Sequence, residues 1–271
     1  ASLPVKDFHN PYQVGTWSEW SSCSRSCCLG VRCRSCLKEP CDGHATELCN
    51  TNVCSERCKE PTDCRRRQEF LSMSDNDKHR FIEAFVAVST HPEWKHRFNA
   101  LARIHFENFL GERIHNRREF LPWHRWYLLM LENLLRCYDC HVTLPYWDWS
   151  LEADSWERSE IWTWIGGDGN WFDNDFVTTG PFRKYSWTHA LVPQTWLRRY
   201  FYPLTATTAT DIGYALSKHT PETFMFPGTG QHTSFEEWLR GLVHNIGHFM
   251  VGGTMLTLYS SGRKKRRIFT D

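Results

Sequence analysis

The sequence predicts a mainly α-helical protein with long irregular loops and a small disulfide-rich module at its N-terminus. Apolar residues recur at helical spacing in three segments, at 81–88, 94–105 and 124–135. Ten of the twelve cysteines fall between Cys23 and Cys64, so the helical segments are almost free of cysteine. With 271 residues, the chain is long enough for one large domain and one small one.

The composition argues against two classes of partner. The formal net charge is +1, so nothing in the charge balance predicts binding to nucleic acid. No run of about eighteen apolar residues occurs, so no membrane span is expected. Clustered cysteines are typical of disulfide scaffolds in an oxidising compartment. We therefore expect a secreted or extracellular protein whose mature N-terminus is Ala1.

The disulfide-rich module is expected at residues 15–54, after an N-terminal arm at 1–14 that shows no periodicity. Its eight cysteines stand in so short a segment that disulfides, rather than a large core, must hold the fold. Tryptophans three residues apart, with arginines downstream, predict guanidinium groups stacked on indole rings. The cysteines alone leave the pairing open.

The WxxW, CxxSC and RxR elements of this module resemble those of a thrombospondin type 1 repeat. The resemblance implies the disulfides Cys23–Cys49, Cys27–Cys54 and Cys36–Cys41, and it leaves Cys28 to pair with Cys33. It also implies a mannose on Trp17, a fucose on Ser26, and partners among extracellular-matrix or cell-surface glycans and proteins. The alternative is a disulfide knot that binds no partner.

A linker and then a larger domain are expected after the module. Residues 55–64 are polar, contain a proline and carry Cys58 and Cys64, which predicts a linker stapled by its own disulfide. The larger domain begins near residue 65. Residues 151–235 are expected to be loop-like, and so long an irregular stretch inside a compact domain is usually functional.

The stretch FLPWHRWYL at 120–128 predicts a helix that carries a histidine. Pro122 suits a first helical turn, and His124 lies on the same apolar stripe as the leucines that follow it. A histidine in that setting is commonly an ordinary core residue. The helix should end near Cys137 and Cys140, whose CxxC spacing we interpret as a local disulfide because no second CxxC lies nearby.

His244 and His248 are four residues apart, so on a helix they would point the same way and could share a metal. Asn245 stands where the HExxH pattern of zinc proteases has its glutamate, so the sequence does not fit that class.

Three histidines upstream could form another metal site. His105 ends a helical segment, His115 follows it, and His124 lies in the next predicted helix. Neutral imidazole suits copper, and a copper ion that binds oxygen needs several such ligands and an open face.

The motifs HxxxxFLPWHR, LPYWDW, GGDGN, TTGPF and HNxxHxxVGGxM, in that order, resemble the type 3 copper family of tyrosinases, catechol oxidases and molluscan haemocyanin units. The resemblance extends from about residue 65 to 260, and it makes 65–271 a tyrosinase-like copper domain. It implies a four-helix bundle that holds two copper ions. It assigns His105, His115 and His124 to the first copper and His244 and His248 to the second.

The resemblance implies two further residues with a role in catalysis. Asn245 matches an asparagine linked to handling the phenol proton, and Glu236 stands where active tyrosinases often keep a glutamate that orders a water with that asparagine. Such a pair could act as a base relay. The alternative for Glu236 is a solvated charge on a helix surface.

The second copper of the family takes a third histidine from a later helix, and no histidine follows His248 here. The copper domain is therefore expected to be incomplete at its C-terminus, either as a fragment or because a downstream cleaved chain of the same precursor supplies the ligand. Arg263 to Arg266 have the RxKR form of a furin-type cleavage site, although a solvated basic loop would look the same.

The function implied is that of a secreted dicopper oxidase that uses O2 to convert phenols or catechols to o-quinones. Its substrate would be a tyrosine- or dopa-like small molecule or a peptidyl tyrosine. The alternatives are a haemocyanin-like oxygen-binding protein and a catalytically inactive tyrosinase-fold protein of the matrix or of adhesion.

Overall fold

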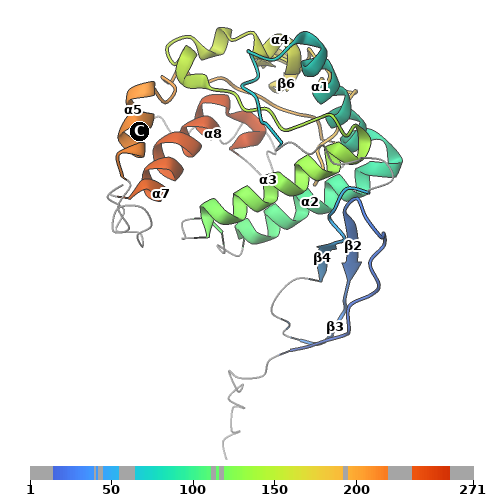
Figure 1. Ribbon diagram of the computed structural model, residues 1–271. Coiled ribbons are helices and arrows are strands. Elements are labelled where there is room, and N and C mark those ends of the chain that lie inside the picture. The colour runs from blue at the N-terminus through green and yellow to red at the C-terminus, as the bar shows by residue number, and fades with distance from the viewer. Residues whose placement is uncertain are drawn as a thin grey trace, which may run out of the picture.

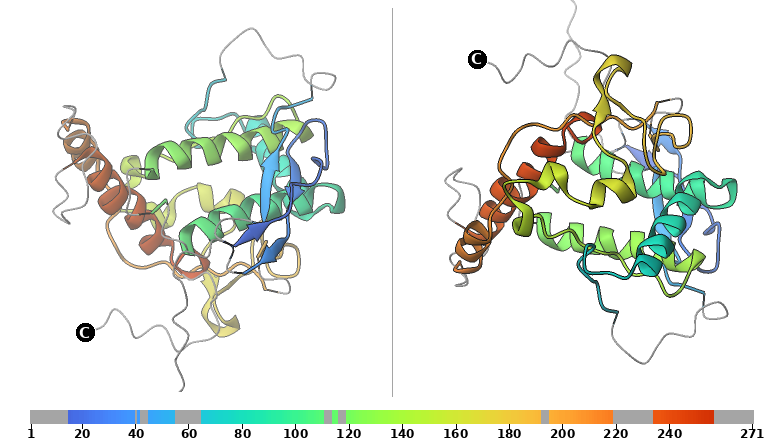
Figure 2. Two further views of the ribbon diagram at one scale, coloured as in Figure 1. Left: turned by 90° about the horizontal axis from the view of Figure 1, so that it is seen from below. Right: turned by 90° about the horizontal axis from the view of Figure 1, so that it is seen from above.

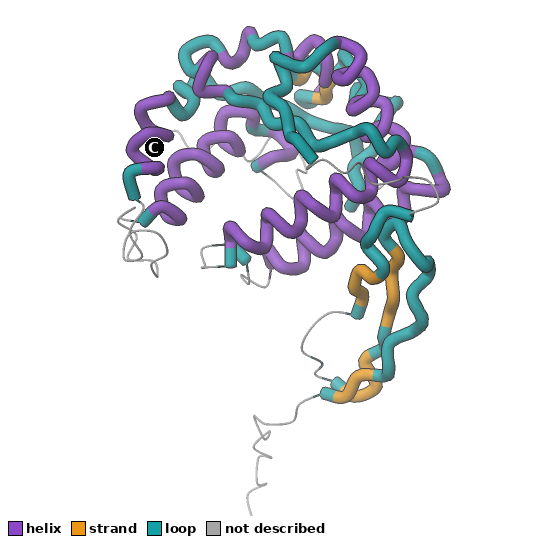
Figure 3. The backbone as a smooth tube through the Cα atoms, in the orientation of Figure 1, coloured by secondary structure: helices purple, strands orange, loops and turns teal. Residues whose placement is uncertain are grey.

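The computed structural model describes residues 15–39, 41, 45–54, 65–110, 114–115, 119–191, 195–218 and 234–256. Within these ranges the protein is mainly helical, as the sequence predicts (Figure 1). Among the described residues, strands are confined to the N-terminal module and to one short hairpin (Figure 3).

Three long helices pack against one another: α1 (Asp75–Thr90), α2 (Pro92–Leu110) and α3 (Phe120–Tyr138). Helix α1 begins after the N-cap Ser74, whose hydroxyl accepts a hydrogen bond from the backbone N–H of Asp77. Pro122 lies in the first turn of α3, where its missing N–H leaves no helical bond unmade. The buried core between these helices includes Val88, Leu101, Leu134 and Leu135.

A second helical stretch is formed by α7 (Phe235–Trp238), η4 (Leu239–His244) and α8 (Asn245–Val251), which follow one another without a break. Segment η4 is a π-helical turn, a distortion that often marks functional sites. A Cβ on Gly247 would lie 3.1 Å from the indole of Trp149, so glycine lets the LPYWDW segment pack directly on α8. Figure 2 shows that this stretch runs across α2 and α3 rather than along them.

The region expected to be loop-like is irregular but holds short elements. They are η1 (Trp149–Glu152), η2 (Trp156–Arg158), α4 (Ile161–Ile165), η3 (Trp171–Asp173), α5 (Ala209–Leu216), and the hairpin of β5 (Gly169–Asn170) with β6 (Phe176–Val177); η5 (Gly253–Met255) follows α8. A second buried cluster, which includes Trp156, Trp162 and Met250, joins this region to α8. Helix α5 was not predicted, although the capping box of Thr208 and Asp211 that begins it is visible in the sequence.

The N-terminal module consists of two antiparallel strand pairs. Strand β1 (Thr16–Trp17) pairs with β3 (Cys36–Lys38), and β2 (Gly30–Cys33) pairs with β4 (Thr46–Cys49). The guanidinium of Arg34 lies 4.2 Å from the ring of Trp17 and 4.5 Å from that of Trp20, which is the stacking that the sequence predicts. The disulfides Cys23–Cys49, Cys27–Cys54 and Cys36–Cys41 are those that the resemblance implies.

The expected disulfides Cys28–Cys33 and Cys137–Cys140 are wrong, because the structure instead joins Cys28 to Cys137 across 109 residues. Cys28 lies at the end of the module that is buried against the helices, and Cys137 is buried in α3 with its Cα 5.7 Å away. Cys33 is exposed on strand β2, away from that contact. The core of α1 to α3 accordingly includes Cys28 and Leu29 of the module.

Three expectations fall on residues outside the described ranges: the arm at 1–14, the staple of Cys58 and Cys64, and the cleavage site at Arg263 to Arg266. None of the described helices is long and apolar enough to cross a membrane.

Candidate metal centre

Helix α3 fixes the ring of His124. Its Nδ1 lies 2.7 Å from the carbonyl oxygen of Phe120, one turn earlier, so Nδ1 carries the proton and donates. The other ring nitrogen, Nε2, is buried and has no hydrogen-bond partner among the described residues. A buried nitrogen with a free lone pair is what a metal ligand requires.

His105 on α2 and His115 in the connection between α2 and α3 face His124. The ring centroid of His115 lies 5.2 Å from that of His105 and 5.0 Å from that of His124. One ring nitrogen from each of the three residues falls within 4.8 Å of the others. Nδ1 of His115 is buried and lacks a partner within the described part of the chain, as Nε2 of His124 does.

The three imidazoles are neutral at neutral pH. Burial, followed by the neighbouring His115 and His124, lowers the pKa of His105 to about 4. Burial and the neighbouring His124 lower the pKa of His115 to about 4 as well. Burial also lowers the pKa of His124. Neutral imidazoles keep the lone pairs that a metal ion needs.

His244 and His248 form a second pair, at the end of η4 and in α8. Their Nε2 atoms lie 3.2 Å apart. Nδ1 of His244 donates to Oδ1 of Asn245 over 3.0 Å, and Nδ1 of His248 donates to the carbonyl of Met255 over 2.8 Å. With both Nδ1 atoms as donors, the two Nε2 atoms are left as acceptors that lie close together. Burial and the neighbouring His248 lower the pKa of His244 to about 4.

The two histidine groups adjoin. The ring centroids of His124 and His244 are 6.1 Å apart, and Phe120 packs against both rings. The donor set consists of imidazole nitrogens, and three of the rings have their Nδ1 atoms held by hydrogen bonds. Outer hydrogen bonds of this kind orient ligand histidines in metal sites, and an all-imidazole set fits copper.

Glu236 and Asn245 are the two residues that the resemblance implies act together as a base relay. Glu236 is 3% exposed, so the alternative of a solvated surface charge is wrong. Its Oε1 accepts a hydrogen bond from Nε of Arg240 over 2.9 Å. Burial raises the pKa of Glu236, although Arg240 opposes the shift. Among the hydrogen bonds of the described residues, none joins Glu236 to Asn245, whose Oδ1 accepts from His244.

The turn after α8 is a part of the site that sequence reasoning missed. Thr254 donates its backbone N–H to the carbonyl of Arg198 and accepts the N–H of Arg198 on its hydroxyl, both over 3.0 Å. Gly252 and Gly253 have φ values of +59° and +56°, and a Cβ on either would collide with backbone of the segment 198–200. The hydrogen bonds of Thr254 and the close packing of the two glycines hold the carbonyl of Met255, which orients His248. The paired glycines were the only signal of this turn in the sequence.

Comparisons with known proteins show the family to which the chain is similar. The common central domain of tyrosinase matches residues 95–263. The chain is 31% identical to the tyrosinase of Streptomyces lincolnensis over 207 residues, which cover 70% of this chain and 73% of that protein. It is 30% identical to the tyrosinase of Streptomyces antibioticus over the same length and coverage. It is 37% identical to grixazone synthase of Streptomyces griseus over 129 residues, 45% of this chain and 41% of that protein. The chain therefore belongs to the tyrosinase family of copper oxidases.

Proposed function

We propose that this protein is a dicopper oxidase that converts phenols or catechols to o-quinones. His105, His115 and His124 hold the first copper, and His244 and His248 hold the second. The observation that carries the proposal is that the five imidazoles converge, with His124, His244 and His248 held by Nδ1 hydrogen bonds that leave Nε2 as the ligand atom. The third ligand of the second copper comes from outside the described residues.

The copper pair, when bound, supplies the binding and reduction of O2 that oxidises the phenol. The protein residues hold the ligands and manage the phenol proton. Because Oδ1 of Asn245 accepts a hydrogen bond from Nδ1 of His244, its Nδ2 amide group is the one that donates to a water or a substrate oxygen. Glu236, buried and with a raised pKa, is the proton acceptor of this pair through an intervening water.

The N-terminal module attaches the oxidase to other molecules by binding them. The stacked face of Trp17, Trp20 and Arg34 supports a thrombospondin type 1-like module that binds extracellular glycans or proteins, with a mannose on Trp17 and a fucose on the exposed Ser26. The disulfides support secretion into an oxidising compartment. Proteolytic cleavage at Arg263 to Arg266 is proposed as a processing step.

The test is oxidation of tyrosine and dopa by copper-loaded protein, followed by O2 consumption and quinone absorbance. We expect quinone formation that His105→Ala abolishes. His79→Ala is the matched control, because His79 is an exposed histidine of α1 whose ring contacts Trp164, outside the histidine group. Binding of O2 without turnover would instead identify an oxygen-binding protein. Absence of both would leave a tyrosinase fold used for binding alone.

A further inference from the structure

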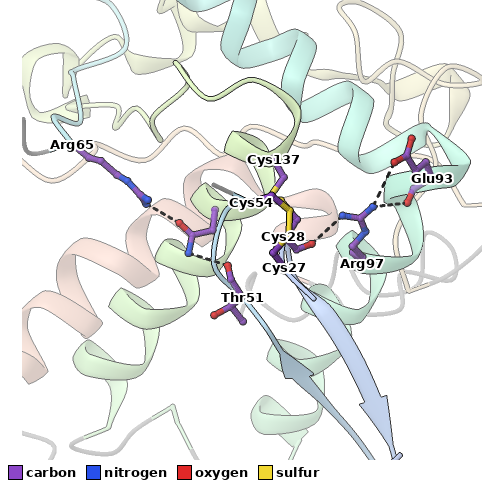
Figure 4. The surroundings of a disulfide bond; sticks show 9 residues. Cys27, Cys28, Thr51, Cys54, Arg65, Glu93, Arg97 and Cys137 are labelled. Carbon is purple, nitrogen blue, oxygen red and sulfur yellow. Dashed lines mark hydrogen bonds and ion pairs between the residues drawn. A yellow bond between two sulfur atoms is a disulfide. The ribbon is translucent and has the colours of Figure 1, made fainter. Parts of the chain in front are cut away.

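Two disulfides lie against each other where the N-terminal module meets the helical domain (Figure 4). Cys27–Cys54 lies within the module, and Cys28–Cys137 joins the module to α3. The sulfur atoms of Cys27, Cys28 and Cys54 all lie within 4.8 Å of one another, and the backbone N–H of Cys54 points at the sulfur of Cys28 over 3.4 Å. All three sulfurs are oxidised, so the group offers no thiolate to a metal. It does place one disulfide within reach of another.

The two bonds differ in exposure. Cys28 is 3% and Cys137 is 1% exposed, so a reductant in solution cannot reach the bond between them directly. Cys27 and Cys54 are both partly exposed. Access controls the rate of thiol–disulfide exchange, so of these two bonds a reductant attacks Cys27–Cys54 first.

We propose that this group is a thiol–disulfide exchange site. A dithiol reductant starts an exchange there that replaces the Cys28–Cys137 disulfide with a Cys28–Cys54 disulfide. A thiolate of the reductant attacks the sulfur of Cys27 and releases Cys54 as thiolate. Cys54 then attacks Cys28, the Cys28–Cys137 bond breaks, and Cys137 leaves as thiolate. The second thiol of the reductant releases Cys27 and closes the reductant into its own disulfide.

The electrons and protons of this sequence balance. The dithiol gives up two electrons and two protons, and the protein gains two thiols, on Cys27 and Cys137. The number of protein disulfides falls by one, because Cys27–Cys54 and Cys28–Cys137 are replaced by Cys28–Cys54.

Cys54, rather than Cys27, is the residue that attacks Cys28. Cys27 and Cys28 are neighbours in the chain, and consecutive Cα atoms are about 3.8 Å apart across a trans peptide. Disulfides usually span about 4.4 to 6.8 Å between Cα atoms, so a bond between neighbours requires a distorted backbone. Cys54 lies on another segment and has no such restriction.

The exchange changes how the module is attached to the helix that carries His124. In the described structure Arg97 of α2 donates to the carbonyl of Cys28 over 2.9 Å, and Asn133 of α3 donates to the carbonyl of Thr51 over 3.3 Å (Figure 4). These contacts are non-covalent. After exchange the module keeps Cys23–Cys49 and Cys36–Cys41 and has Cys28–Cys54 in place of Cys27–Cys54, but α3 loses its covalent bond to Cys28.

Two single substitutions form a matched test, because each removes the Cys27–Cys54 bond and leaves one thiol behind. In Cys27→Ser the remaining thiol is Cys54, so we expect Cys28–Cys54 to form without added reductant and Cys137 to be alkylated by N-ethylmaleimide. In Cys54→Ser the remaining thiol is Cys27, which should itself be alkylated while Cys28–Cys137 stays intact. Peptide mapping by mass spectrometry without reduction shows which bonds exist. Equal labelling of Cys137 in the two variants would overturn the proposal.

The unmodified protein gives a second test that does not depend on the folding of a variant. Limiting dithiothreitol at neutral pH, followed by acid quenching and alkylation in denaturant, should label Cys27 and Cys137 and yield a peptide linked through Cys28 and Cys54. Labelling of Cys27 and Cys54 with Cys28–Cys137 preserved would refute the exchange step.

Discussion

The imidazole of His248 donates a hydrogen bond from Nδ1 to the carbonyl oxygen of Met255 over 2.8 Å. That carbonyl is placed by the neighbouring Thr254, which exchanges two hydrogen bonds with the backbone of Arg198. The ring of His248, which we propose as a copper ligand, is therefore oriented by the turn that follows α8.

Replacing Thr254 by valine should weaken copper binding. The change keeps the side-chain volume but removes the hydroxyl that accepts from Arg198, so the Met255 carbonyl is held less firmly. Loss of an outer hydrogen bond in metal sites typically lowers affinity about tenfold or more. Titration against a competing chelator measures the effect. Thr163→Val is the control, because Thr163 is exposed in α4, and an equal loss in both variants would contradict this role.

Replacing Gly252 by alanine should destabilise the copper-free protein. Gly252 has a φ of +59°, and an added Cβ would collide with the carbonyl of Tyr200. We therefore expect the free energy of unfolding to fall by about 1 to 3 kcal/mol. Gly213→Ala is the matched control, since Gly213 lies inside α5 with open space around it. That change should stabilise the protein by about 0.5 to 1 kcal/mol. Denaturant unfolding would contradict the account if both changes had the same sign.

The stability of the copper-free protein should fall as the pH falls from 6.5 to about 4. The pKa values of His105, His115 and His244 are lowered from 6.5 to about 4 in the folded state, chiefly by burial. Between these values the unfolded chain binds more protons than the folded protein, so acid favours unfolding. Melting temperatures across this range measure the slope. His244→Gln should reduce it, and a melting temperature that stays level or rises on acidification would contradict the assignment.

Replacing Glu236 by glutamine should affect both stability and the choice of substrate. The change removes the charge that faces the mostly buried Arg240. We therefore expect the free energy of unfolding to fall by about 2 kcal/mol, which is less than for a fully buried pair. If Glu236 accepts the phenol proton, turnover of tyrosine should fall about a hundredfold. Turnover of dopa should fall less. Glu157→Gln, at an exposed position, is the control, and an unchanged ratio of the two rates would remove Glu236 from the proton path.

The sequence predicted the long helices because their apolar residues repeat at helical spacing and their starts carry recognisable residues such as Ser74 and Pro122. The site histidines could be named because of the resemblance, since His115 and His124 share one motif and His244 and His248 share another, while His105 ends the helical segment before them. The π-helical turn at 239–244 could not be predicted. It depends on how α7 and α8 pack on the rest of the domain rather than on local propensity.

The partner of Cys28 was also beyond sequence reasoning. Cys33 is near in the chain and Cys137 is 109 residues away, yet folding buries Cys28 beside α3 and leaves Cys33 exposed. The same is true of Glu236, whose partner Arg240 stands one helical turn later but whose burial depends on tertiary packing.

The most direct test of the central claim is the copper content of the intact protein, measured by native mass spectrometry on material from its natural source. We expect two copper ions in the intact protein, and the loss of one of them in a His124→Ala variant. A single copper or none in the intact protein, with no change on replacing His124, would contradict the assignment of a dicopper centre.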